Sequence, residues 1–213
     1  MNQCDADRFR CLCFALLAWA VASLSTGAYA KTDVAPKVVL ETTMGVITVE
    51  VWVHQAPRSA GSFLKFVDDG RFSDAGFYRV VRPDNDNGSP PIRVIQGGVL
   101  DDQSITAADQ VPHETTQMTG IVHTDGVLSL ARSAPGTGSG GTFFICIGDQ
   151  PGLDFGATRN ADGQGFAAFG RVVEGMDVVR AINALTDTQA VTDPYVEHQI
   201  LAQPVAITAA YRL

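Results

Sequence analysis

The sequence predicts a mainly β protein whose strands close into an antiparallel barrel, with two helices added. Short β-rich runs recur along the 213 residues and are separated by loops rich in Gly, Asn, Asp and Pro. Only two stretches show the apolar spacing of a helix, and they lie far apart in the chain. Because helices do not alternate with strands, a parallel α/β sheet is disfavoured, and many short strands are typical of a barrel.

The chain opens with a predicted hairpin. Two β-rich runs, Val38 to Thr42 and Val46 to Val53, are joined at Met44-Gly45. A helix is predicted from Pro57 to about Val67, because proline suits the first helical turn and the apolar residues that follow share one face. Gly70 follows the end of this helix, where glycine is common.

The rest of the chain is predicted to hold short strands and a second helix. The helix runs from about Met176 to Leu185, with apolar residues spaced along one face. The last strand is Val205 to Tyr211. The strands before it are predicted at residues 77–81, 94–96, 127–131, 142–147 and 167–173.

Residues 1–30 have the composition of a secretory signal peptide. Arg8 and Arg10 precede an apolar run from Cys11 to Leu24, and Ala28-Tyr29-Ala30 provides a small-x-small cleavage site. The apolar run is short for a membrane span, although an uncleaved N-terminal anchor is the alternative. We expect cleavage near Ala30 and one exported domain, residues 31–213, in a bacterial periplasm.

Composition excludes several functional classes for residues 31–213. The net charge of −8 is the same with or without the signal segment, and it argues against nucleic acid as a partner. Cys146 is the one cysteine left after cleavage, so no internal disulfide or cysteine metal site is possible, and we expect a buried, inert thiol. The four histidines lack metal-ligand spacing.

The run Phe77 to Val81 carries one arginine among apolar strand residues, and Gln96 follows in the run Val94 to Gly98. Simple alternation places Arg79 on the same face as Phe77 and Val81. An arginine in this position either forms an ion pair with a nearby carboxylate or is kept for a ligand.

Further blocks lie before and after this run in the order found in the cyclophilins, and together with the run they resemble that family. They are Thr43 to Gly45 with Ala56 to Ser59, Gly126 to Arg132, Gly141 to Cys146, and Ala168 to Val179. The resemblance covers roughly residues 37 to 212. It implies a closed eight-stranded antiparallel barrel capped by two α-helices, and peptidyl-prolyl cis-trans isomerase activity with no cofactor and no metal.

The resemblance also implies the roles of individual residues. Arg79 is the hydrogen-bond donor that stabilises the twisted X-Pro amide, and Gln96 binds the substrate backbone. The proline socket is implied at Phe144 and Leu153, with Ala131 as the small residue that lets the peptide approach. Before Gln96 the family has a phenylalanine and then a methionine, and this sequence has Arg93 and Val94 at these positions. Ile92 is a candidate replacement for the phenylalanine ring.

This sequence departs from the family pattern around the socket. The spacing from Arg79 to Gln96 is longer by roughly nine residues, an insertion that costs little because loop-closure entropy grows slowly with length. We expect this loop and a second one, 156–165, to be mobile surface loops near the site. Residues that differ from the family's usual ones are Arg93, Arg132, Thr142, Gly152 and Phe166.

We therefore expect a monomeric peptidyl-prolyl isomerase that acts on proline-containing segments of exported proteins and assists their folding, without stable membrane insertion. The alternative is a cyclophilin-fold chaperone or assembly subunit that binds such segments with little or no turnover. Arg79, Gln96 and Phe144 favour the enzyme, while the altered positions around the socket favour the binder.

Overall fold

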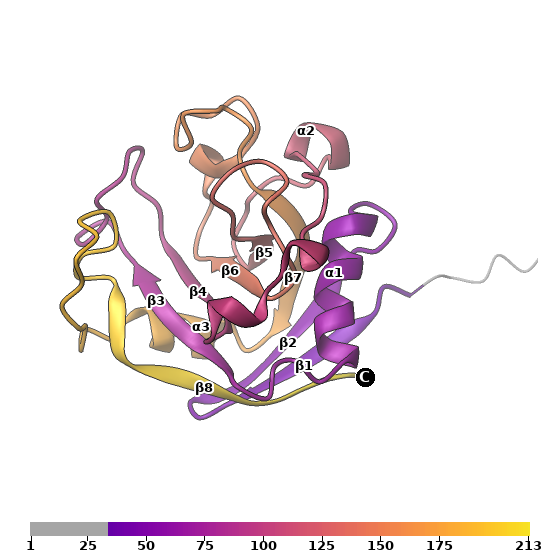
Figure 1. The fold of residues 1–213 in the computed structure, drawn as a ribbon, viewed down its shortest axis with the longest axis horizontal. Helices are drawn as coiled ribbons and strands as arrows, with labels where there is room; N and C mark the ends of the chain where they lie inside the picture. The colour runs from indigo at the N-terminus through magenta and orange to yellow at the C-terminus, as the bar shows by residue number, and fades with distance from the viewer. Residues whose placement is uncertain (1–33) are drawn as a thin grey trace, which may run out of the picture. The chain divides into compact units, whose positions relative to one another are not determined.

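Each predicted β-rich run forms a strand in the computed structural model, which describes residues 34–213. The eight strands close into one antiparallel barrel in the order β1-β2-β7-β5-β6-β4-β3-β8 (Figure 1). The predicted signal peptide and its cleavage site lie outside the described residues. The strands are β1 (Lys37–Thr42), β2 (Gly45–Val51), β3 (Ala75–Val81), β4 (Val94–Val99), β5 (Val127–Leu130), β6 (Thr142–Cys146), β7 (Ala167–Glu174) and β8 (Ile200–Arg212).

Two helices were predicted, and both are present as α1 (Pro57–Asp68) and α3 (Met176–Asn183). A third, one-turn helix, α2 (Thr116–Thr119), was not predicted. It is too short to show an apolar period, and it is set instead by local hydrogen bonding. The hydroxyl of Thr115 accepts the Met118 amide at 3.3 Å, and Gly120 ends the turn in the left-handed conformation. None of the helices in residues 34–213 is long and apolar enough to cross a membrane.

The last strand is longer than predicted, beginning at Ile200 instead of Val205. Pro204 lies within it, and a proline normally argues against a strand interior because it cannot donate to the ladder. The added segment matters for the site, since Ile200 pairs with Arg79 of β3. The first half of β8 pairs with β3, and its C-terminal part pairs with β1, which closes the barrel.

The interior of the barrel is packed with aromatic rings. Helix α1 contributes Phe63, whose ring centroid lies 5.3 Å from that of Phe143 and 5.2 Å from that of Phe169. Phe143 in turn meets Phe77 at 5.9 Å, edge to face. Aromatic pairs in such geometries add stability beyond the area that they bury. This core fixes β3, β6 and β7 against α1.

A second, smaller apolar cluster lies on the opposite face of the same strands. In β6, Phe143 and Ile145 belong to the barrel core, whereas Phe144 and Cys146 belong to the second cluster. In β4, Ile95 is in the core and Val94 in the second cluster. Successive side chains of a strand point to opposite faces, so this sheet is apolar on both sides here. The outer cluster forms the floor of the candidate site.

Candidate active site

Arg79 reaches the outer face of the barrel through a β-bulge in β3. The register with both neighbouring strands shifts between Phe77 and Arg79, which leaves Tyr78 as the extra residue. Simple alternation placed Arg79 on the face of Phe77, and this prediction is wrong. Phe77 is fully buried in the barrel core, whereas Tyr78, Arg79 and Val81 line one cavity on the outside.

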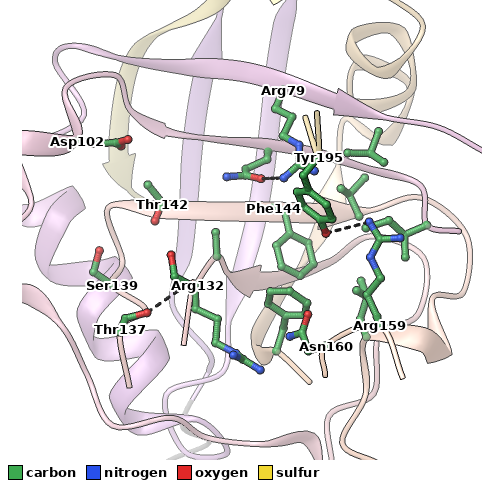
Figure 2. A pocket seen from close by; sticks show the side chains of 18 of the residues that line it. Arg79, Asp102, Arg132, Thr137, Ser139, Thr142, Phe144, Arg159, Asn160 and Tyr195 are labelled. Atoms are coloured by element: carbon green, nitrogen blue, oxygen red, sulfur yellow. Dashed lines mark hydrogen bonds between the residues drawn. The ribbon is translucent and has the colours of Figure 1, made fainter. Parts of the chain in front are cut away.

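Two glutamine side chains hold the guanidinium of Arg79. Its Nε and Nη2 donate to Oε1 of Gln199 at 2.9 and 2.6 Å, and its Nη1 donates to Oε1 of Gln96 at 3.1 Å (Figure 2). Gln96 is oriented in turn by Tyr78, whose hydroxyl oxygen accepts from Nε2 at 3.0 Å. These contacts use three of the five N–H groups of the guanidinium, so two remain for a substrate.

No carboxylate of the described residues neutralises the positive charge of Arg79. No ion pair of Arg79 is found within residues 34–213, so the alternative of a structural salt bridge does not apply there. Burial lowers the pKa of Arg79, and interactions with Tyr195 oppose this effect. The guanidinium lies over the Tyr195 ring, 5.4 Å from its centroid. An arginine keeps its proton under such conditions, so the site presents an uncompensated cation.

An apolar socket lies beside this cation. Phe144 from β6 forms its centre and meets Phe166 edge to face at 5.2 Å. Val81, Ile92, Val94 and Leu153 are buried around it, and Ala131 packs at the side. Ile92 thus contributes an apolar side chain to the wall; it is the candidate replacement for the phenylalanine ring that the resemblance implies at the position of Arg93.

All the predicted site residues line one cavity of about 940 Å³. This brings side chains from β3, β4 and β6 together with loop residues that lie far apart in the sequence (Figure 2). The volume is at the upper end of the range typical of ligand sites. The predicted residues that share this cavity are Arg79, Ile92, Val94, Gln96, Ala131, Phe144 and Leu153.

The altered positions have separate structural explanations. Arg132 lines the cavity but forms a bidentate ion pair with Asp162, at 2.8 and 2.9 Å, and also donates to the Gly165 carbonyl. The hydrogen bonds from Arg132 lower the pKa of Asp162 to about 2. Thr142 and Phe166 line the cavity, whereas Arg93 is exposed and does not.

Gly152 does not line the cavity, because the inserted loop covers it. A Cβ atom at Gly152 would lie 2.6 Å from Cγ of Pro90, closer than real contacts allow. The loop therefore occupies the space where the resemblance implies an aromatic side chain. Glycine is required here because Pro90 packs directly against the backbone.

The two loops that we interpreted as mobile are joined by a buried ion pair. Nη1 and Nη2 of Arg159 each donate to a carboxylate oxygen of Asp86 at 2.8 Å, and the two side chains are 2% and 0% exposed. Asp86 also accepts from the amides of Gly88 and Ile92, at 3.0 and 2.7 Å. Burial alone would raise the pKa of Asp86, but the hydrogen bonds from Arg159 and the two amides lower it. The carboxylate thus organises the inserted loop around itself.

A third loop, residues 184–199, was not assigned to the site from the sequence. Nε2 of Gln199 donates to the Asn85 carbonyl at 2.8 Å, and Nδ2 of Asn87 donates to the Glu197 carbonyl at 3.1 Å. The hydroxyl of Tyr195 accepts from Arg159 at 3.2 Å, and its ring lines the cavity between the two arginines (Figure 2). These residues carry no apolar period, and Gln199 is 120 positions from Arg79, so no local pattern indicated them.

Behind the socket lies a buried polar network that the sequence also did not reveal. His123 is 1% exposed, and its ring stacks on Phe144 with centroids 6.0 Å apart. Its Nδ1 lies 2.7 Å from Asp154, and its Nε2 lies 3.1 Å from the Ser129 hydroxyl. Because Phe144 covers the ring, we interpret this network as a support for the socket.

Side chains that could hold a metal ion do not cluster in the part of the chain that the structure describes, since no group of three His, Cys, Asp or Glu residues was found. Cys146 is fully buried, and burial raises the pKa of its thiol well above the ordinary value. The expected buried thiol is confirmed.

Comparisons with known proteins agree with this geometry. The family model described as "Cyclophilin type peptidyl-prolyl cis-trans isomerase/CLD" matches residues 37–207. A peptidyl-prolyl cis-trans isomerase of Arabidopsis thaliana is 32% identical over 174 residues, which are 80% of this chain and 93% of the relative. One from Acinetobacter baylyi is 30% identical, over 79% of this chain and 80% of the relative.

Solved structures confirm the fold. A Cryptosporidium parvum cyclophilin-type isomerase, crystallised in the presence of the dipeptide Ala-Pro, superposes with a TM-score of 0.60. The superposition covers 83% of this chain and 98% of that structure, at 18% sequence identity. This supports the predicted closed barrel of eight strands.

Proposed function

Because this chain belongs to the cyclophilin-type peptidyl-prolyl cis-trans isomerase family, we propose that it accelerates X-Pro rotation in exported proteins and so assists their folding. The family establishes the isomerase class, whereas the substrates and the site residues are our proposal. The observation that carries it is the uncompensated guanidinium of Arg79 beside an apolar socket.

Rotation about an X-Pro bond faces a barrier of about 18–20 kcal/mol, because the amide loses resonance as it twists. In the twisted state the nitrogen lone pair becomes available as a hydrogen-bond acceptor. A free N–H of Arg79 donates to this nitrogen once the proline ring rests on Phe144. A charged hydrogen bond of about 1.5–3 kcal/mol accounts for one to two decades of rate. Desolvation and positioning of the peptide supply the rest.

The remaining residues hold the peptide in place. Gln96 binds the substrate backbone with the hydrogen-bonding capacity that Arg79 and Tyr78 leave unused. Ile92, Val94 and Leu153 enclose the proline ring, and the small side chain of Ala131 lets the backbone approach. No nucleophile and no acid–base pair is needed, because no covalent bond is broken.

Exchange-rate NMR on an Ala-Pro peptide, with catalytic amounts of protein, tests the proposal. Arg79→Ala should lower the catalysed exchange at least tenfold and leave the thermal midpoint nearly unchanged. Arg93→Ala is the matched control, because Arg93 is exposed and outside the cavity. Full activity of Arg79→Ala would refute the assignment. A wild type that binds the peptide without accelerating exchange would be a binding module instead.

Export is supported by the composition of residues 1–30, namely the two arginines, the apolar run and the small residues before Lys31. We expect the mature protein to begin at or near Lys31 and to carry one thiol. Intact mass and thiol titration of protein from the native host measure both. An intact N-terminus, or a protein with four thiols, would point to an uncleaved membrane anchor.

A further inference from the structure

A second cavity, of about 310 Å³, adjoins the proposed active site. Tyr78 and Asp102 line both cavities, so the two lie side by side, and we call them together the groove. The second cavity lies on the outer face of β3, between Leu100 after β4 and the first residues of β8. The bulge that turns Tyr78 outward makes it the wall between the two cavities.

Apolar side chains form part of the walls of this second cavity. They include Leu100 after β4 and Ile200 and Pro204 of β8, while Tyr78, Asp102 and Gln189 add polar groups. Leu100 is 40% exposed, a high value for a leucine. Such a surface suits the aliphatic part of a side chain that reaches past Tyr78.

Asp102 is the one charged side chain that lines this cavity among the described residues. Its carboxylate forms no ion pair within residues 34–213. Burial is the main reason for the raised pKa of Tyr78, and the charge of Asp102 adds to it, so the carboxylate acts on this wall. Arg132 and Arg159 also line the first cavity (Figure 2). Each is already neutralised by a carboxylate, Arg132 by Asp162 and Arg159 by Asp86.

We propose that the second cavity is a substrate subsite for a lysine or arginine side chain of the peptide whose proline occupies the socket. The aliphatic stem packs on Leu100, Ile200 and Pro204, and the cationic head pairs with Asp102. This inference rests on the proposed function, because it assumes that a proline-containing peptide lies along the groove. It makes Asp102 a residue that determines substrate specificity.

The test compares peptides in which each residue around one proline is in turn lysine, norleucine or alanine. Norleucine keeps the aliphatic stem and removes the charge, so the lysine-to-norleucine ratio of kcat/KM isolates the contribution of Asp102. At one position we expect kcat/KM of the lysine peptide to exceed that of the norleucine peptide by about two- to fivefold, the range for one exposed ion pair. Norleucine should in turn exceed alanine, because it contacts the apolar walls. The lysine advantage should shrink toward one in about 1 M salt.

Asp102→Asn should abolish the lysine advantage, and Asp102→Lys should reverse it. The matched control is Glu174→Gln, which removes the same charge at the end of β7, a strand that lines neither cavity. Equal rates for lysine and norleucine at every position overturn the subsite, as does an advantage that survives in Asp102→Asn. Calorimetric measurement of the affinity for the same peptides distinguishes failure of the subsite from failure of the proposed isomerase function. If no peptide is isomerised but lysine binds more tightly than norleucine, the proposed function fails and the subsite stands.

Discussion

Gln199 accepts two hydrogen bonds from Arg79 without neutralising its charge. A carboxylate in the same place would hold the guanidinium equally well, but it would neutralise the cation and compete with the amide nitrogen of the substrate. A neutral amide positions the donor and leaves its electrostatic effect intact. Since Gln199 also donates to the Asn85 carbonyl, the inserted loop contributes to the position of Arg79.

This argument predicts that Gln199→Glu, a change with almost no difference in shape, lowers kcat/KM about tenfold, a change of about 1.4 kcal/mol in the barrier. The fold should remain, because the ion pair that the new carboxylate gains with Arg79 offsets the lost hydrogen bond to the Asn85 carbonyl. Exchange NMR on an Ala-Pro peptide measures the effect. Gln110→Glu is the control, since Gln110 lines the same cavity without bonding to Arg79. An equal loss in both variants would mean that added negative charge, and not the pairing with Arg79, is responsible.

Among the secondary-structure elements, β3 shows what the sequence could and could not reveal. Apolar runs located all eight strands, because each strand buries at least one face. The bulge at Tyr78 was missed, since an alternating pattern assumes that every residue pairs in register. Gln199 and Tyr195 were missed because they belong to a loop, where side chains follow no period. The socket residues were identified through family resemblance, since apolar strand residues alone look like ordinary core.

A buried ion pair between Asp86 and Arg159 helps to fix the conformation of the inserted loop. Removing one partner of such a pair is costly, because the other charge stays buried without compensation. Asp86→Asn should therefore lower the free energy of unfolding by about 3 kcal/mol. Asp84→Asn, in the same loop but 71% exposed, should change it little. Urea unfolding at neutral pH compares the two variants, and equal losses would contradict the role of the ion pair.

The same carboxylate makes stability depend on pH. The pKa of Asp86 is lowered from 3.8 in the folded state, so its contribution is fully present above 3.8 and is lost as the pH falls through the folded value. Wild type should lose stability below about pH 4 more steeply than Asp86→Asn, which has no carboxyl to protonate at this position. Parallel curves in acid unfolding would contradict this assignment.

For the whole molecule, the barrel depends on pairing between the two ends of the described chain. β8 pairs with β3 through its first half and with β1 through its last residues. Without the β1–β8 pairing, both strands would have an open edge. The side chain of Val39, now 6% exposed, would become exposed to solvent. The same strand brings Ile200 against Arg79, so closure of the barrel and geometry of the site are coupled.

Deletion of residues 209–213 tests this coupling. It removes four of the five register pairs between β1 and β8, those of residues 209, 210, 211 and 212. At about 1 kcal/mol for each lost backbone hydrogen bond, the free energy of unfolding should fall by about 4 kcal/mol, a large part of the 5–15 kcal/mol typical of a domain. Urea unfolding and Ala-Pro exchange should both report the loss. Deletion of Leu213 alone is the control. Its side chain is exposed and its amide donates one hydrogen bond to the Lys37 carbonyl, so this deletion should keep full activity and lose only about 1 kcal/mol of stability. If the longer deletion keeps full activity and stability, the barrel does not need the pairing between β1 and β8. Pairing of β3 with β4 would then be enough to hold Arg79 in place.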